Sequence, residues 1–215
     1  MIQLRKAGLV ADHEDVERLR CEFEKNHFVM LRDLFDPELL SLVLSNLEQG
    51  QWRDSAESGF YSESVLENCA APALLQFVSN TPKFLKTISE ITGINSLTWF
   101  VGRVYRMRPY VDRTDEWHTD AAHGRLIGMS LNLSPRGFEG GLFQMREGQP
   151  GRMLVEIANT GLGDAILFRL TPDFRHRVTE VQGDQPKTAF AGWFTSVNQS
   201  MKERLDRQEL AGRVR

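Results

Sequence analysis

Residues 97–107 read LTWFVGRVYRM, a run in which aromatic and β-branched side chains alternate with small or charged ones. Such alternation is typical of a β-strand with one buried face. Further short strand candidates follow, separated by turns that contain Gly or Pro: GRLIGMSLNL (124–133), GGLFQM (140–145), RMLVEI (152–157), DAILFRL (164–170), FRHRVTEV (174–181) and KTAFAGWF (187–194). Several short strands at this spacing predict a β-sandwich or β-barrel.

The part of the chain before this run has helical signals. We expect helices over residues 12–26, 37–49 and 83–92, with a strand over 27–35 between the first two. Asp36 is a suitable N-cap and Pro37 a suitable first helical residue for the second helix. Thr81 and Pro82 repeat that start signal before the third helix, and Gly93 fits its C-terminal cap.

The chain length of 215 residues suits one domain of ordinary size. We therefore predict a single domain over residues 1–215, mainly β with flanking helices. Its predicted parts are a helical N-terminal part over about 1–95, a β core over about 96–197 and a C-terminal helix over about 198–211.

Composition limits the function classes. Hydrophobic residues make up 41% and charged residues 26%, values close to those of an average globular protein. The net charge of -3 argues against general binding to nucleic acid, because no basic excess neutralises phosphates. No stretch reaches the length of a membrane span and the N-terminus has no signal-like apolar region, so we expect a cytoplasmic protein. Cys21 and Cys69 have no metal-site spacing and are interpreted as reduced core thiols.

Two histidines and one aspartate have the pattern of metal ligands. His118 and Asp120 are two residues apart in WHTD (117–120), and such residues point to the same side of an extended chain. His176 lies in a later strand candidate. Two imidazoles and a carboxylate can occupy one face of an octahedral iron(II) ion and leave three positions open. An H-x-D pair alone is frequent by chance, so the assignment depends on the surrounding motifs.

The segment after His176 predicts a β-hairpin. Residues 174–181 and 187–194 flank Gly183 and Asp184, a pair that forms tight turns. In this hairpin the two strands pair directly with each other.

Lys187 is the first residue of the second strand of that hairpin. By parity its side chain points to the same face as His176, on the order of 13 Å away along the ladder. At that distance its ammonium group could hold the far carboxylate of a dicarboxylic 2-oxo acid that binds the metal at its other end. The alternative is a solvated strand lysine paired with Glu180. Thr188 could assist only if the strand twists, because it otherwise points away.

Taken in chain order, these segments resemble the 2-oxoglutarate/Fe(II) dioxygenase superfamily, and within it the prolyl-4-hydroxylase-like branch. The resemblance covers roughly residues 97 to 196, with a weaker echo in FEKNHFVMLRDLFDPELL. It rests on five motifs: VGRVYRM, WHTD, SLNLSPRGFEGGLFQM, GLGDAILFRLTPDFRHRV and KTAFAGWF. The H-x-D pair alone is a weak signal, whereas the ordered set is specific.

The resemblance implies a double-stranded β-helix, also called a jelly roll. It implies that His118, Asp120 and His176 bind iron, and that Lys187, eleven residues after His176, pairs with the far carboxylate of 2-oxoglutarate. Tyr105 matches a tyrosine that often contacts the same cosubstrate.

Further positions are candidates for contacts to the cosubstrate or the substrate. Tyr105 precedes His118 by thirteen residues, slightly more than is usual, so Tyr110 competes for its role. Thr188 is a second candidate contact to the cosubstrate. Arg125 follows the ligand pair closely and is a candidate for substrate binding, although a solvated arginine is the simpler interpretation.

The resemblance also implies a reaction. With iron(II), 2-oxoglutarate and dioxygen, the enzyme would hydroxylate an unactivated C–H bond of an amino acid, a peptide or a small metabolite. Asp120 fills the place that halogenating relatives leave open for a halide, which favours hydroxylation. Two alternatives remain: a cupin-like metalloenzyme that does not use 2-oxoglutarate, which usually has more histidine ligands, and a non-catalytic metal-binding jelly-roll module. No nucleic-acid or membrane partner is expected.

Overall fold

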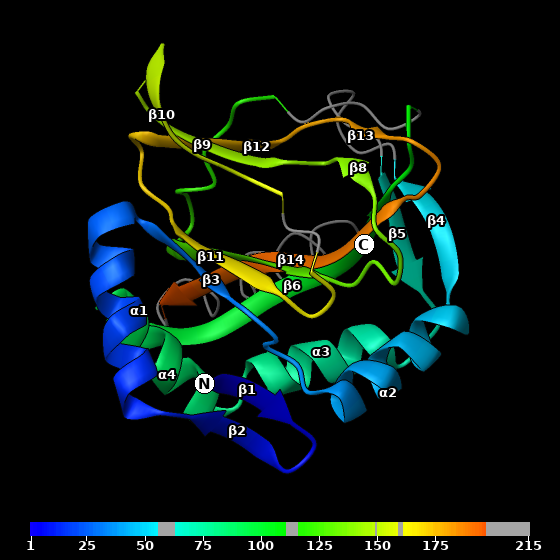
Figure 1. The fold of residues 1–215 in the computed structure, drawn as a ribbon, viewed down its shortest axis with the longest axis horizontal. Coiled ribbons are helices and arrows are strands. Elements are labelled where there is room, and N and C mark those ends of the chain that lie inside the picture. The colour runs from blue at the N-terminus through cyan, green and yellow to red at the C-terminus, as the bar shows by residue number, and fades with distance from the viewer. Residues whose placement is uncertain (56–62, 111–115, 149, 159–160, 197–215) are drawn as a thin grey trace, which may run out of the picture.

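The structure is a computed structural model that describes residues 1–55, 63–110, 116–148, 150–158 and 161–196. Two antiparallel β-sheets face each other, and helices cover the outer face of the larger sheet (Figure 1). The predicted C-terminal helix lies outside the described residues.

Four helices occur in the described part of the chain: α1 (His13–Asn26), α2 (Pro37–Glu48), α3 (Ala71–Ser79) and α4 (Pro82–Thr92). The predicted start of α2 is confirmed, since the Asp36 carboxylate accepts a 2.7 Å hydrogen bond from the Leu39 N–H. Gly93 ends α4 in the left-handed conformation, with φ 69°, as its lack of a side chain allows. Helix α3 was not predicted.

The larger sheet, here the major sheet, has seven strands in the order β3-β11-β7-β14-β6-β5-β4. Their bounds are β3 (Phe28–Leu31), β11 (Ala165–Arg169), β7 (Arg125–Asn132), β14 (Lys187–Ser196), β6 (Leu97–Met107), β5 (Glu63–Glu67) and β4 (Gln51–Ser55). The last two were not predicted. Their sequences, QWRDS and ESVLE, lack a clear apolar alternation; β4 is the edge strand of the sheet, and β5 lies between β4 and β6.

The opposite sheet, here the minor sheet, has the order β10-β9-β12, with bounds β10 (Gly151–Ile157), β9 (Phe143–Gly148) and β12 (Phe174–Val178). Two short pairs complete the described strands: β8 (Glu139–Gly140) with β13 (Val181–Gln182), and β1 (Ile2–Arg5) with β2 (Gly8–Ala11). The chain passes between sheets from β11 to β12 and again from β12 to β14. This alternation is the jelly-roll arrangement, so the predicted fold class is confirmed.

The two faces of β14 separate two apolar layers. Phe190 and Phe194 are fully buried on the helix side, where Phe194 packs against Phe84 of α4 at 6.1 Å between ring centroids. Each buried phenylalanine contributes about 1.5–3 kcal/mol relative to an exposed one. Ala189 and Ala191 alternate with these residues and face the minor sheet. Their small side chains leave space between the sheets.

The predicted hairpin of residues 174–181 with 187–194 is wrong. Strand β12 pairs with β9, and β14 pairs with β6 and β7, so the two segments belong to different sheets. Lys187 lies opposite Met107 rather than Glu180. Alternation within a strand indicates which face is buried but carries no information on the partner strand.

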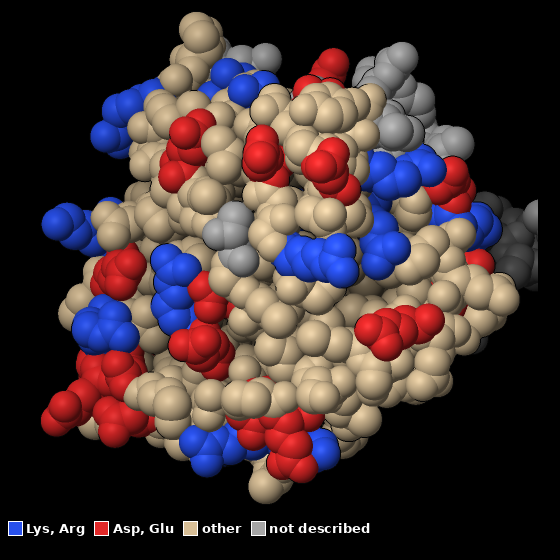
Figure 2. Space-filling view, turned by 45° about the vertical axis from the view of Figure 1, so that its right-hand side comes forward, with Lys and Arg blue, Asp and Glu red and all other residues tan. Residues whose placement is uncertain are grey.

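Charged side chains of both signs are interspersed over the face shown in Figure 2. No helix in the described part of the chain is long and apolar enough to cross a membrane. Both cysteines are free, but Cys21 is exposed on α1, so its prediction as a core thiol was wrong.

Candidate metal centre

The side chains of His118, Asp120 and His176 converge in the space between the two sheets. His176 projects from β12, and the other two belong to the segment before β7. The Asp120 Oδ2 atom lies 3.8 Å from His118 Nε2 and 3.4 Å from His176 Nε2. One ligand atom from each residue lies within 4.8 Å of the other two. Donors about 2.1 Å from a shared ion lie about 3–4 Å apart, a range that includes both distances from Asp120 Oδ2, so small side-chain movements would bring the three residues onto one metal ion.

Backbone and side-chain contacts orient His118. Its Nδ1 atom is 2.8 Å from the Glu116 carbonyl oxygen, which can only accept a hydrogen bond. That nitrogen therefore carries the proton, and Nε2 keeps the lone pair that a metal ligand needs. The backbones of His118 and His176 also exchange hydrogen bonds of 3.2 and 2.9 Å as an isolated antiparallel bridge.

Asp120 is held by a tryptophan of the central strand. The Trp193 Nε1–H donates a 2.7 Å hydrogen bond to Asp120 Oδ2, and the Arg125 guanidinium lies over the Trp193 ring at 3.7 Å. Burial raises the pKa of Asp120, but hydrogen bonding and charge attraction from His176, with smaller effects of Trp193 and His118, outweigh burial and lower the pKa to about 2. The carboxylate is therefore ionised at neutral pH, as a metal ligand must be.

These three residues border a cavity of about 640 Å³. Its volume lies in the usual range for small-molecule sites. Arg103 and Glu63, which form an ion pair, line the cavity, and Arg125 lines it as well. Charges of both signs therefore border the space next to the metal ligands.

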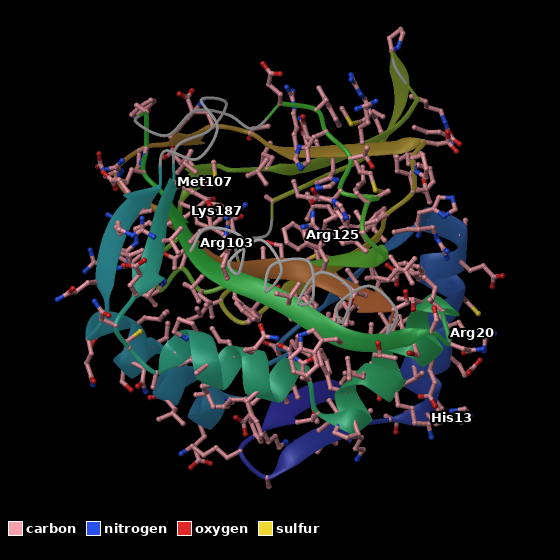
Figure 3. The ribbon with its side chains drawn as sticks, turned by 180° about the vertical axis from the view of Figure 1, so that it is seen from behind. His13, Arg20, Arg103, Met107, Arg125 and Lys187 are labelled. Carbon is pink, nitrogen blue, oxygen red and sulfur yellow. The ribbon has the colours of Figure 1, made fainter. Side chains whose placement is uncertain are left out.

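Lys187 lies further along the same face of β14, beyond Ala189 and Ala191. In Figure 3, it lies close to Met107 and Arg103, while Arg125 is further along the space between the sheets. The residue is 2% exposed, and its Nζ atom donates a 2.7 Å hydrogen bond to the Gly141 carbonyl oxygen. It does not itself line the cavity.

The buried Lys187 ammonium has little compensation for its charge. None of the described acidic residues forms an ion pair with it, and burial lowers the pKa of Lys187 to about 8. The Lys187 Nζ atom also lies 5.7 Å from the centroid of the Phe138 ring. A buried cation with only neutral groups against it is well suited to receive an anionic ligand, because a carboxylate would restore the lost solvation.

The other candidate cosubstrate contacts are placed differently. Tyr105 lines the cavity, whereas Tyr110 is exposed and its hydroxyl oxygen accepts a 3.1 Å hydrogen bond from the Gly183 N–H. Thr188 does not line the cavity. Its Oγ1 atom accepts a 3.2 Å hydrogen bond from Arg106 Nε on the opposite face of β14, because neighbouring residues of a strand alternate in direction. The Thr188 side chain thus points away from the face that carries Lys187, as expected for a strand without a local twist.

Trp117, Trp193 and Glu63 have no role predicted from the sequence. Both tryptophans stood inside quoted motifs, and Trp117 is adjacent to a predicted ligand. The position of Trp117 next to His118 was the signal in the sequence that could have indicated its place at the site. The ion pair of Arg103 with Glu63 could not be foreseen, because β5 was not predicted.

Neither a protein-family model nor a curated protein sequence matches the chain. Among solved structures, it is similar to an oxidoreductase of the 2OG-Fe(II) oxygenase family from Burkholderia pseudomallei, with TM-score 0.66 and 15% identity over 93% of this chain and 98% of that one. The chain has the fold of the 2-oxoglutarate/Fe(II) oxygenases.

Two further structures share this oxygenase fold. A prolyl-4-hydroxylase from Pseudomonas putida has TM-score 0.62 and 13% identity over 85% of this chain and 99% of that one. A prolyl hydroxylase from Trichoplax adhaerens, in complex with a hypoxia inducible factor peptide fragment, has TM-score 0.61 and 12% identity over 87% and 94%. At these identities the likeness establishes the fold, and the chemistry has to be argued from the side chains.

Proposed function

We propose that the protein is an iron(II)- and 2-oxoglutarate-dependent oxygenase that hydroxylates a C–H bond of an amino acid, a peptide or a small metabolite. The observation that carries this proposal is the convergence of His118, Asp120 and His176 at the cavity of an oxygenase fold. This donor set is the facial triad of iron(II) oxygenases, which leaves positions open for other ligands. Two free cysteines agree with a cytoplasmic location, which is part of the proposal.

In this proposal iron supplies the activation of dioxygen, coupled to decarboxylation of 2-oxoglutarate. His118 and His176 bind as neutral imidazoles and Asp120 as a carboxylate, which together hold the ion on one side. Trp193 fixes the carboxylate through its N–H group.

Lys187 is proposed to receive the far carboxylate of 2-oxoglutarate. The two alanines between Lys187 and Trp193 on the inner face of β14 leave room for the carbon chain, and Tyr105 borders the same space. Arg103 on β6 and Glu63 on β5 present charge of both signs to the substrate.

The experiment that tests this function is anaerobic loading with iron(II), followed by 2-oxoglutarate and dioxygen with succinate as readout. The wild-type protein should release succinate slowly without substrate, and His118→Ala or Asp120→Ala should abolish that release. Screening amino acids, peptides and metabolites for a mass gain of one oxygen atom then identifies the substrate. Wild-type protein that binds iron(II) but never consumes 2-oxoglutarate would contradict the proposal.

Lys187→Met separates the cosubstrate role from folding. A hydrogen bond to a charged group contributes about 1.5–3 kcal/mol, so the concentration of 2-oxoglutarate needed for half-maximal turnover should rise about 10- to 150-fold. Lys83→Met is the matched control, because the Lys83 Nζ atom also donates one hydrogen bond to a backbone carbonyl, that of Leu9, at 2.8 Å. The control should leave the 2-oxoglutarate requirement unchanged.

A further inference from the structure

Trp117, Arg146 and Arg177 form a cluster beside the first metal ligand, here called the Trp117 cluster. The guanidinium carbon of Arg146 lies 4.2 Å from the centroid of the Trp117 ring, and that of Arg177 lies 4.7 Å from it. Both distances are within the range in which a cation is attracted to an aromatic face. Trp117 immediately precedes the ligand His118 and also borders the cavity.

The cluster joins the ligand segment to the minor sheet. Arg146 is on β9 and Arg177 on β12, where they alternate with the buried Met145 and His176. Their side chains therefore leave the sheet on the face opposite to the metal ligands. Trp117, at the edge of the sheet, is in contact with both of these neighbouring strands through the two arginines.

The two arginines are themselves positioned. Arg177 Nε donates a 2.7 Å hydrogen bond to Gln144 Oε1, and Gln144 Nε2 donates a 2.5 Å hydrogen bond to Glu156 on β10. The Arg146 Nε atom is buried and has no hydrogen-bond partner among the described residues, so its environment is dominated by the indole ring. Through Gln144 and Glu156, the contacts of the cluster reach all three strands of the minor sheet.

The backbone alone attaches this ligand segment weakly. His118 is joined to His176 by an isolated bridge of two hydrogen bonds and not by a continuous ladder. On the C-terminal side of His118 the Thr119 hydroxyl donates a 3.0 Å hydrogen bond to the Thr171 carbonyl oxygen, so the rotation that would move the His118 ring has to be limited from the Trp117 side. A contact on the neighbouring residue limits that rotation, because Trp117 is fixed on the opposite side of the chain.

We propose that the Trp117 cluster is a positioning device that holds His118 in place for the metal before the metal binds. The proposal rests on the metal centre of the proposed function, but not on 2-oxoglutarate or on any substrate. The three residues are half-buried, and even the value for exposed sites gives each cation–π contact about a 2- to 5-fold effect on an equilibrium constant, so loss of both should weaken metal binding about tenfold.

The test is anaerobic titration of the full chain with Co(II), without 2-oxoglutarate, read by visible absorption and calorimetry. Trp117→Leu should weaken Co(II) binding about tenfold, whereas Trp117→Phe, which keeps an aromatic face, should stay within about threefold of wild type. The matched control is Trp99→Leu, at a tryptophan on β6 that is 43% exposed, which should leave the affinity unchanged.

The paired arginine variant keeps the proposal falsifiable even if a tryptophan variant folds poorly, because wild-type Co(II) affinity in Arg146→Met with Arg177→Met would overturn the proposal without any tryptophan variant. Arg146→Met combined with Arg177→Met should weaken Co(II) binding as much as Trp117→Leu, and should add nothing in the Trp117→Leu background. Wild-type affinity in Trp117→Leu, an equal loss in Trp117→Phe, or additive losses would each overturn the proposal. Failure of wild-type protein to bind Co(II) would instead overturn the metal centre itself.

Discussion

Replacement of Trp193 by phenylalanine isolates one hydrogen bond to Asp120, a proposed metal ligand. The indole Nε1–H is the donor to Asp120 Oδ2 at 2.7 Å, and Trp193→Phe removes that donor while keeping an aromatic ring for Arg125 to stack on. Without the hydrogen bond, the carboxylate can rotate away from the two imidazoles. We expect weaker iron(II) binding with the fold retained.

The magnitude follows from the environment of Asp120. A hydrogen bond to a charged group contributes about 1.5–3 kcal/mol, and the lower end applies here because the Asp120 side chain is 20% exposed. A loss of about 1.5 kcal/mol corresponds to about tenfold weaker metal binding, at the lower end of the effects known for residues that orient metal ligands.

The assay is anaerobic iron(II) titration by calorimetry, with the thermal midpoint of the metal-free protein measured in parallel. Trp99→Phe is the matched control, since Trp99 lies on β6 away from the ligands and is 43% exposed. An iron(II) affinity of Trp193→Phe within twofold of wild type would refute the idea that the indole N–H orients Asp120.

Three further results are expected. Burial lowers the pKa of Lys187 to about 8, and only its ammonium form attracts a carboxylate. The affinity for 2-oxoglutarate should therefore fall as pH rises above 8, by up to about tenfold per pH unit. Calorimetry at pH 7 and pH 9 on the Ni(II)-loaded protein measures this trend, which should be absent in Lys187→Met. Ala191→Leu should fill the space between Lys187 and the proposed metal ligands. Binding of 2-oxoglutarate should then weaken more than about tenfold, while Ni(II) affinity stays within about threefold of wild type. Wild-type affinity for 2-oxoglutarate in this variant would show that the cosubstrate does not bind along the inner face of β14. Asp36→Ala removes the N-cap of α2 and should lower the free energy of unfolding in urea by about 1 kcal/mol, whereas an unchanged midpoint would mean that water replaces the cap.

Local signals in the sequence were sufficient for the elements with strong caps and apolar alternation. Asp36 and Gly93 mark helix ends that the structure has, and the strand candidates after residue 97 lie in the two sheets. Segments of polar strand were missed. Residues 51–55 form an edge strand, whose side chains need no apolar pattern to be stable there.

At the candidate site, too, the features set by neighbouring residues were predicted and those set by distant parts of the chain were not. The spacing of His118 and Asp120 was informative because it depends on a few neighbouring residues. The wrong hairpin between β12 and β14 arose because strand pairing is decided by the whole sheet arrangement. The Trp193 hydrogen bond to Asp120 joins residues 73 positions apart, so neither periodicity nor spacing could have indicated it.

The inner face of β14 has a consequence for which acids the protein can accept. Ala189 and Ala191 separate Lys187 from Trp193 by fixed steps of the pleat, and the sheet on either side makes this separation rigid. If Lys187 receives one end of the cosubstrate, the fixed spacing along β14 selects acids by the length of their carbon chain. Dicarboxylic 2-oxo acids that are one carbon shorter or longer should then bind less tightly than 2-oxoglutarate.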